Sequence, residues 1–218
     1  MSAPSHSSAP ARPIPFMLRG ALGFAAVSVA AFAIWAFGGR WFRGHGGEGA
    51  MYATIAVAFV LLTGLLLHPL VPGDRRLGRF YSIFAPAFVA YAVVWSVFWF
   101  WLKAGLGEWL GALLGSGVFV ALTAWRLGRW QGFTLAAIVF FALHTAGYFA
   151  GGRSMDLLMA AARQKPPPFL NAATLVLLAK LSWGLFYGLG FGAGLGHVFA
   201  ALQPPAANPS AGSSVLPS

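Results

Sequence analysis

The chain alternates long apolar runs with short stretches that hold most of its charged residues. The runs lack the period-two alternation of barrel strands, and they reach the roughly 20 residues that an α-helix needs to cross the hydrocarbon core. The pattern therefore predicts an all-α, polytopic integral membrane protein with a bundle of about six transmembrane helices. These helices are predicted at about 16–38, 51–71, 80–102, 106–125, 130–151 and 174–202.

The segments outside these helices are poorer in apolar residues. The tails 1–15 and 203–218 are rich in Ser, Ala and Pro and are predicted to be disordered, which leaves 16–202 as a single transmembrane domain. The segment 154–164 has helical periodicity, with Asp156 near its start, and is followed by three prolines. It is predicted to form a separate interfacial helix that lies along the membrane surface.

Composition supports the same class. Of the 218 residues, 59% are hydrophobic and only 8% are charged, whereas an ordinary soluble domain carries about 25% charged residues. The net charge of +10 would suggest nucleic acid in a soluble protein, but here the basic residues lie in short connections, as topology signals beside a lipid bilayer do. No nucleic-acid partner is predicted. The chain has no cysteine, which excludes disulfides, thiolate catalysis and cysteine-ligated metals.

The basic residues also predict an orientation. The tightest cluster is Arg75, Arg76 and Arg79, and Arg126 and Arg129 fall on the same side of a six-helix scheme. Positive residues favour the cytoplasmic side, so both termini are predicted to be cytoplasmic. Arg exceeds Lys, and Ala and Gly are abundant, as in GC-rich bacterial genomes. The predicted location is therefore a bacterial inner membrane.

Two predicted helices carry glycine at every fourth position, which leaves one side of each helix nearly bare backbone. Such ladders let helices approach closely in lipid, where van der Waals packing replaces the hydrophobic effect. The fourth and sixth helices are therefore predicted to pack on each other, and a homo-oligomer or a membrane partner docked on either ladder is the alternative. The ladder positions are Gly107, Gly111 and Gly115 in the fourth helix, and Gly184, Gly188, Gly192 and Gly196 in the sixth.

Polar side chains inside the predicted spans are candidate functional groups, because a charge at the bilayer centre costs about 3 kcal/mol on insertion scales. His144 and Tyr148 lie one turn apart on one helix face, where they would form a local polar pocket. The alternative is a neutral His144 imidazole that is hydrogen-bonded to a neighbouring helix. The full set of candidates is His68, Glu108, His144, Tyr148, Lys180 and His197.

The other four candidates form two possible pairs. His68 and His197 are predicted at similar depth, where they would ligate a haem iron, share a proton in a transport path, or reach the headgroups as interfacial residues. Lys180 and Glu108 are predicted near the outer surface. Either snorkelling or an ion pair between the sixth and fourth helices accounts for them.

The chain contains no motif of a membrane protease, kinase, P-loop pump or acyltransferase, so no catalytic residue, metal or cofactor is predicted, apart from haem in the histidine-pair alternative. The predicted function is a small-solute transporter or permease-like protein in which His144, Tyr148 and Lys180 line one cavity. The first alternative is a non-catalytic accessory or structural subunit that docks a partner through an exposed glycine ladder. The second is a b-type haem protein.

Overall fold

The computed structural model describes residues 13–103, 105–164 and 169–203, and most of the two predicted tails lie outside this range. The described residues contain no strand, and six helices are long and apolar enough to cross a membrane, which confirms the predicted all-α class. The elements are α1 (Pro13–Gly44), α2 (Gly47–Leu67), the 3₁₀ turn η1 (His68–Leu70), α3 (Arg76–Leu102), α4 (Leu106–Leu127), α5 (Phe133–Arg163) and α6 (Ala172–Leu202).

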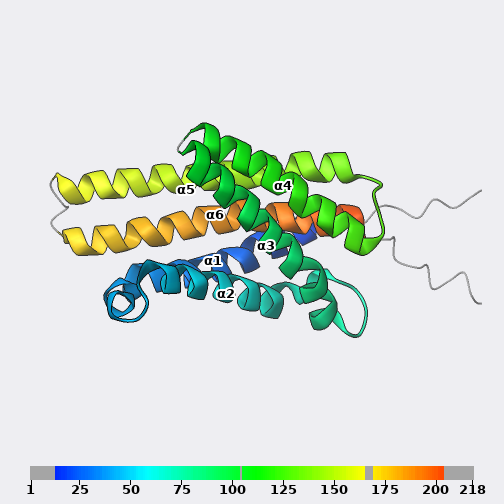
Figure 1. Ribbon diagram of the computed structural model, residues 1–218, viewed down its shortest axis with the longest axis horizontal. Coiled ribbons are helices and arrows are strands. Elements are labelled where there is room, and N and C mark those ends of the chain that lie inside the picture. The colour runs from blue at the N-terminus through cyan, green and yellow to red at the C-terminus, as the bar shows by residue number, and fades with distance from the viewer. Residues whose placement is uncertain (1–12, 104, 165–168, 204–218) are drawn as a thin grey trace, which may run out of the picture.

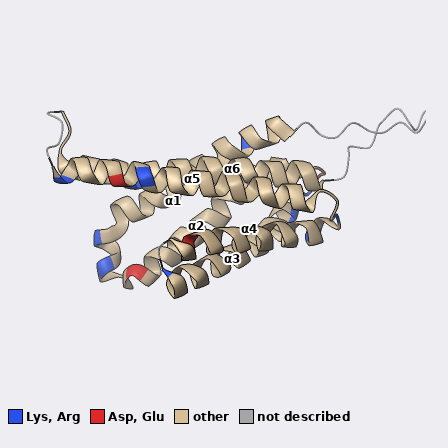
Figure 2. Ribbon diagram, turned by 90° about the horizontal axis from the view of Figure 1, so that it is seen from above, with Lys and Arg blue, Asp and Glu red and all other residues tan. Residues whose placement is uncertain are grey.

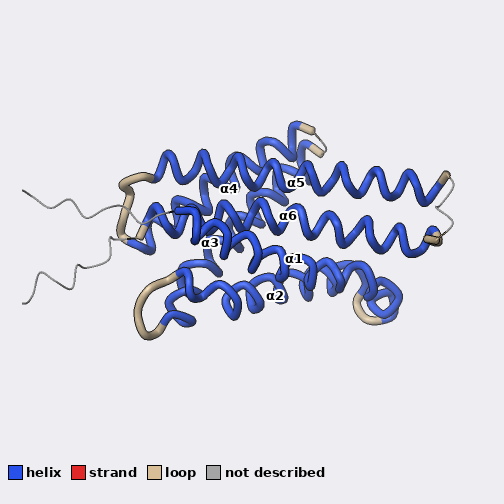
Figure 3. The backbone as a smooth tube through the Cα atoms, turned by 180° about the vertical axis from the view of Figure 1, so that it is seen from behind, coloured by secondary structure: helices blue, strands red, loops and turns tan. Residues whose placement is uncertain are grey.

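Helices α5 and α6 lie side by side as a long antiparallel pair, and α1 packs on the other side of α6 (Figure 1). Helix α2 lies against α1, and the α3–α4 hairpin crosses the long helices at an angle. Short connections join consecutive helices (Figure 3). The start of α1 and the end of α6 share one end of the bundle, called the terminal end below, and the α3–α4 and α5–α6 connections lie toward the other, called the far end.

Helix α5 does not break where the sequence predicts an interfacial helix. It continues to Arg163, so the predicted helix 154–164 is its last three turns. Helix α6 runs beside this extension, because Gly151 packs on Trp183 and the Ser154 and Ser182 hydroxyls lie 2.6 Å apart. At 1.5 Å per residue, a 31-residue helix is about 46 Å long and exceeds the roughly 30 Å hydrocarbon core.

Helix α6 uses glycine on two faces. The ladder Gly184, Gly188, Gly192 and Gly196 faces α1, and a Cβ added at Gly192 would overlap the backbone oxygen of Gly20. A second face meets α5, where a Cβ at Gly190 would lie 2.8 Å from the Cα of Gly147. Backbone therefore meets backbone on both sides, and α1, α6 and α5 form one closely packed unit.

The glycine ladder of α4 faces α3 and not α6. Cβ atoms added at Gly107 and Gly111 would meet the backbone of Phe98 and Trp95, and one added at Gly115 would meet Tyr91. The predicted packing of the fourth helix on the sixth is therefore wrong. The consecutive α3–α4 hairpin takes up the ladder instead, because only a short connection separates the two helices.

Between the α3–α4 hairpin and α6 the space is filled by aromatic rings. Phe191 of α6 lies at the centre of these rings. Its ring centroid is 5.7 Å from those of Phe88 and Phe119 and 5.4 Å from that of Tyr91. Nearer the terminal end, Phe199 stacks on Phe80. Helix α6 thus contacts α1 and α5 through both backbone and rings, and it contacts α3 and α4 through rings.

The packing of α6 on α1 predicts opposite effects of the same substitution at two helical glycines. Gly192→Ala places a methyl group on the Gly20 carbonyl and should lower the free energy of unfolding by about 1–3 kcal/mol. At Gly117 of α4 no atom lies within 4 Å of an added Cβ, so Gly117→Ala should be neutral or stabilising. Unfolding of both variants in detergent micelles measures the difference, and equal effects would contradict this packing.

Candidate functional site

The centre of the bundle holds a buried hydrogen bond between two helices that are not consecutive. Tyr91 of α3 and His144 of α5 approach with the phenol oxygen 2.7 Å from Nε2. His144 has no exposed surface and Tyr91 is 5% exposed. Phe140, Tyr187 and Phe191 surround the imidazole at centroid distances of 5.7 to 6.1 Å. His144 lies eleven residues after Phe133, about 16 Å along α5, and so near the middle of a membrane span.

The second imidazole nitrogen has no partner. Within the described part of the chain, neither Nδ1 of His144 nor the hydroxyl of the adjacent Thr145 makes a hydrogen bond. A neutral imidazole has one donor and one acceptor nitrogen, so Nδ1 is unsatisfied in either tautomer. A buried unsatisfied group costs about 1–3 kcal/mol, which is why such groups in native proteins call for an explanation.

Tyr148 lies one turn further along α5, toward the far end, and adds another polar group next to the Tyr91–His144 pair. Its hydroxyl donates to Oε1 of Glu108 at 3.0 Å, and Oε2 of Glu108 accepts from the backbone N–H of Gly105 at 3.3 Å at the start of α4. The Tyr148 ring lies between the indoles of Trp95 and Trp183, at 5.7 and 5.8 Å. The carboxylate is thereby tied to α5 and to the first turn of its own helix.

A cavity of about 490 Å³ lies beside this group. Glu108, Tyr148, Phe149 and Trp183 line it, and Arg153 and Asp156 are its exposed charged residues. Neither His144 nor Lys180 lines this cavity, although the transporter prediction requires both. Most charged residues of the described part of the chain lie toward the ends of the helices (Figure 2).

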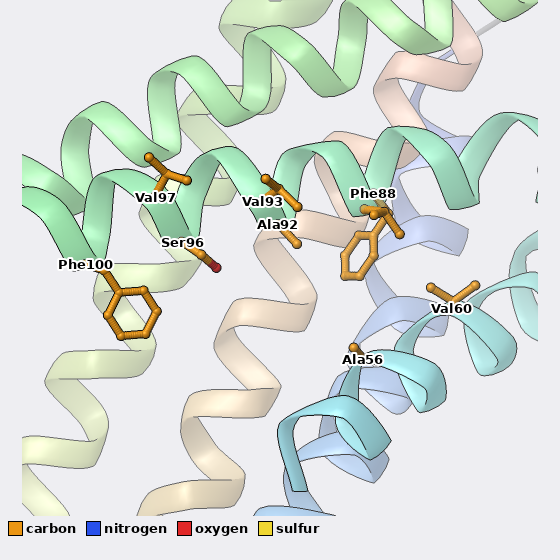
Figure 4. A pocket seen from close by; sticks show the side chains of 9 residues that line it. Ala56, Val60, Phe88, Ala92, Val93, Ser96, Val97 and Phe100 are labelled. Atoms are coloured by element: carbon orange, nitrogen blue, oxygen red, sulfur yellow. The ribbon is translucent and has the colours of Figure 1, made fainter. Parts of the chain in front are cut away.

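A second hollow of about 480 Å³ lies between α2 and α3 and is nearly all apolar. Phe88 points toward α2 at one end of it, and Ser96 and Phe100 follow along α3 (Figure 4). Ser96 is the only hydroxyl in its lining. With exposed Val89, Val93 and Val97 on its α3 side, it is a groove of the apolar surface and holds no candidate polar residue.

Lys180 does not pair with Glu108, contrary to the predicted ion pair. Its ammonium lies 4.6 Å from the Trp35 ring centroid and donates to the Trp35 carbonyl oxygen at 3.5 Å. Helix α6 packs on α1 along the glycine ladder, which brings Lys180 to α1 and away from α4. The Glu108 carboxylate accepts from Tyr148 and Gly105 instead.

The two outer histidines are engaged separately. In η1, Nδ1 of His68 donates to the carbonyls of Leu65 and Gly64 at 3.0 and 3.2 Å. Among the described residues, His197 Nε2 has no partner, and no hydrogen bond or ring contact joins His197 to His68. The same part of the chain holds no group of three His, Cys, Asp or Glu residues placed to bind a metal ion.

Sequence reasoning placed His144 and Tyr148 on one face but missed their partners, Tyr91 and Tyr187. Both tyrosines lie well inside apolar helices, where a phenol oxygen needs a hydrogen-bond partner. That signal was present in the sequence. The identity of the partner was not, because it depends on how α3 crosses α5.

Comparison with protein-family models, curated proteins and solved structures finds no match to this chain, so its residues and their geometry carry the functional argument.

The central pair predicts a coupled effect on stability. Tyr91→Phe removes the one hydrogen-bond partner that the buried imidazole has among the described residues, and it should lower the free energy of unfolding by about 1–3 kcal/mol. His144→Leu leaves a buried phenol unpaired, and the double variant should lose less than the sum of the two. A double-mutant cycle in micelles measures this coupling. Tyr52→Phe, at a tyrosine that is 60% exposed, is the matched control and should change nothing. Strict additivity would contradict the pair.

Proposed function

We propose that this protein is a small-solute transporter or permease-like protein of a bacterial inner membrane, with both termini in the cytoplasm. The observation that carries the proposal is a row of polar side chains, called the polar line below, which consists of the buried Tyr91–His144 pair, of Tyr148 one turn along α5, and of Glu108 beside the cavity. Polar and ionisable groups in the middle of membrane helices are costly, and they commonly mark transport paths.

The polar line borders a cavity at only one of its ends. Glu108 and Tyr148 border the cavity at the far end, whereas the core on the terminal side of His144 contains closely packed Phe rings, including Phe84, Phe119 and Phe199. A path open on one side and closed on the other is what alternating access requires of a single conformation.

The packing supports a motion that would close the polar line at the far end and open it at the terminal end. Helices α1, α6 and α5 are joined through glycine backbone contacts, and α3 and α4 through a second glycine ladder. Between these two units lie mostly aromatic rings, which can slide past one another more easily than interlocked backbones. Rocking of the α3–α4 hairpin would part Tyr91 from His144 and open the line toward the terminal end.

The accessory-subunit alternative lacks its supporting feature. The glycine ladders of α4 and α6 are covered by α3 and α1, so neither is free to dock a partner. The orientation rests on the arginines at the terminal end, Arg75, Arg76, Arg79, Arg126 and Arg129, which face cytoplasm under the positive-inside rule.

Water access to the central pair tests the proposal, and the cysteine-free chain is a ready background. In proteoliposomes, His144→Cys should react with a small, water-soluble thiol reagent, because a transporter opens its path to water for part of the time. Ser28→Cys is the matched control: Ser28 is equally buried, at 0% exposure, but lies at the α1–α6 contact away from the path, and should stay protected. Equal protection of both positions would contradict a transport path.

A further inference from the structure

We infer that the cavity beside Glu108 binds a small organic cation of the ammonium type and that this cation is the transported solute, an assignment that rests on the proposed function. The residues that carry it are the carboxylate of Glu108 and the rings of Tyr148, Phe149 and Trp183, all of which line one cavity of about 490 Å³. This volume falls in the range of small-molecule sites.

The charge of the cavity favours a cation. Its lining holds two carboxylates, Glu108 and Asp156, against one guanidinium, Arg153. Arg153 and Asp156 are exposed, so Glu108 is the charge of the inner wall. Both hydrogen bonds to Glu108 come from neutral donors, the Tyr148 hydroxyl and the Gly105 N–H, which orient the carboxylate without neutralising it.

Three aromatic rings contribute to the lining of the cavity, those of Tyr148, Phe149 and Trp183. Tyr148 makes edge contacts with both neighbours, at 64° and 5.8 Å to Trp183 and at 82° and 5.3 Å to Phe149. Aromatic rings that line a cavity together with a carboxylate can recognise ammonium groups through cation–π attraction. The protein's own cation–π contacts in the described residues, Lys180 on Trp35 and Arg126 on Trp125, do not use these three rings.

The location of the cavity suits the uptake step. The cavity adjoins the far end of the bundle, where water reaches Arg153 and Asp156, and Tyr148 connects it to His144 one turn deeper. A cation that enters past Arg153 and Asp156 first meets the rings of Tyr148, Phe149 and Trp183. Further along the polar line it reaches the Tyr91–His144 pair.

Binding of choline to the purified full-length protein in detergent tests the inference. We expect choline to shift the melting temperature upward and to quench tryptophan fluorescence with saturation, because Trp183 lines the cavity. The matched ligand is 3,3-dimethylbutan-1-ol, which has the shape of choline without its charge and should bind at least tenfold more weakly. Equal responses to the two ligands, or no saturable response to choline, would overturn the inference.

Three substitutions distinguish the loss of the Glu108 charge from a failure of the protein to fold. Glu108→Gln keeps an acceptor for Tyr148 and should weaken choline binding at least tenfold. Glu48→Gln changes an exposed carboxylate in the first turn of α2 and should have no effect. Phe149→Leu removes one ring with the charge intact and should weaken binding several-fold, which keeps the test decisive if Glu108→Gln fails to fold. Unchanged affinity in Glu108→Gln or Phe149→Leu would exclude this cavity as the site.

Transport and binding fail in different ways. If choline binds but the cysteine of His144→Cys stays protected from thiol reagents, the cation site is supported and the transport function is contradicted. If that cysteine reacts but choline does not bind, the transport path is supported and the cation is excluded as its solute.

Discussion

The fold depends on the close approach of backbones on two sides of α6. In lipid no hydrophobic effect drives helices together, so stability comes from the density of van der Waals contact, and glycine gives the shortest distance between axes. The ladder from Gly184 to Gly196 meets α1, and Gly190 meets Gly147 of α5. With both flanks given to backbone contact, only one face of α6 remains for large side chains.

That remaining face explains where the polar groups lie. It carries Phe191 to Tyr91 of α3, and Tyr187 to His144 of α5 and Phe59 of α2. Within this aromatic layer, Tyr91 reaches His144 across the bundle. The polar side chains at the centre of the bundle therefore lie in the ring-filled space between the two glycine-packed units.

The class and the six helices were predictable, because length and apolar content decide them locally. The placement of His144 and Tyr148 was half predictable: their spacing places them on one face, but nothing in the sequence identifies Tyr91. The glycine ladders indicated close packing without naming the partner. Gly111 contacts Trp95, and Lys180 contacts Trp35, because α4 packs on α3 and α6 packs on α1. The spacing of glycines along one helix does not indicate which helix is its neighbour. The last three turns of α5 were predicted as a separate interfacial helix. They continue α5 because α6 packs beside them, a contact that the sequence does not reveal.

The most direct test of the account is nuclear magnetic resonance of the protein in micelles with glycine as the only protonated residue type. The packing predicts Overhauser effects between the α-protons of Gly20 and Gly192 and between those of Gly147 and Gly190, whose backbones are in contact. It predicts none between Gly107, Gly111 or Gly115 and the glycines of α6. Cross-peaks between the α4 and α6 ladders, with the first two pairs silent, would contradict α6 as the helix on which α1 and α5 are assembled.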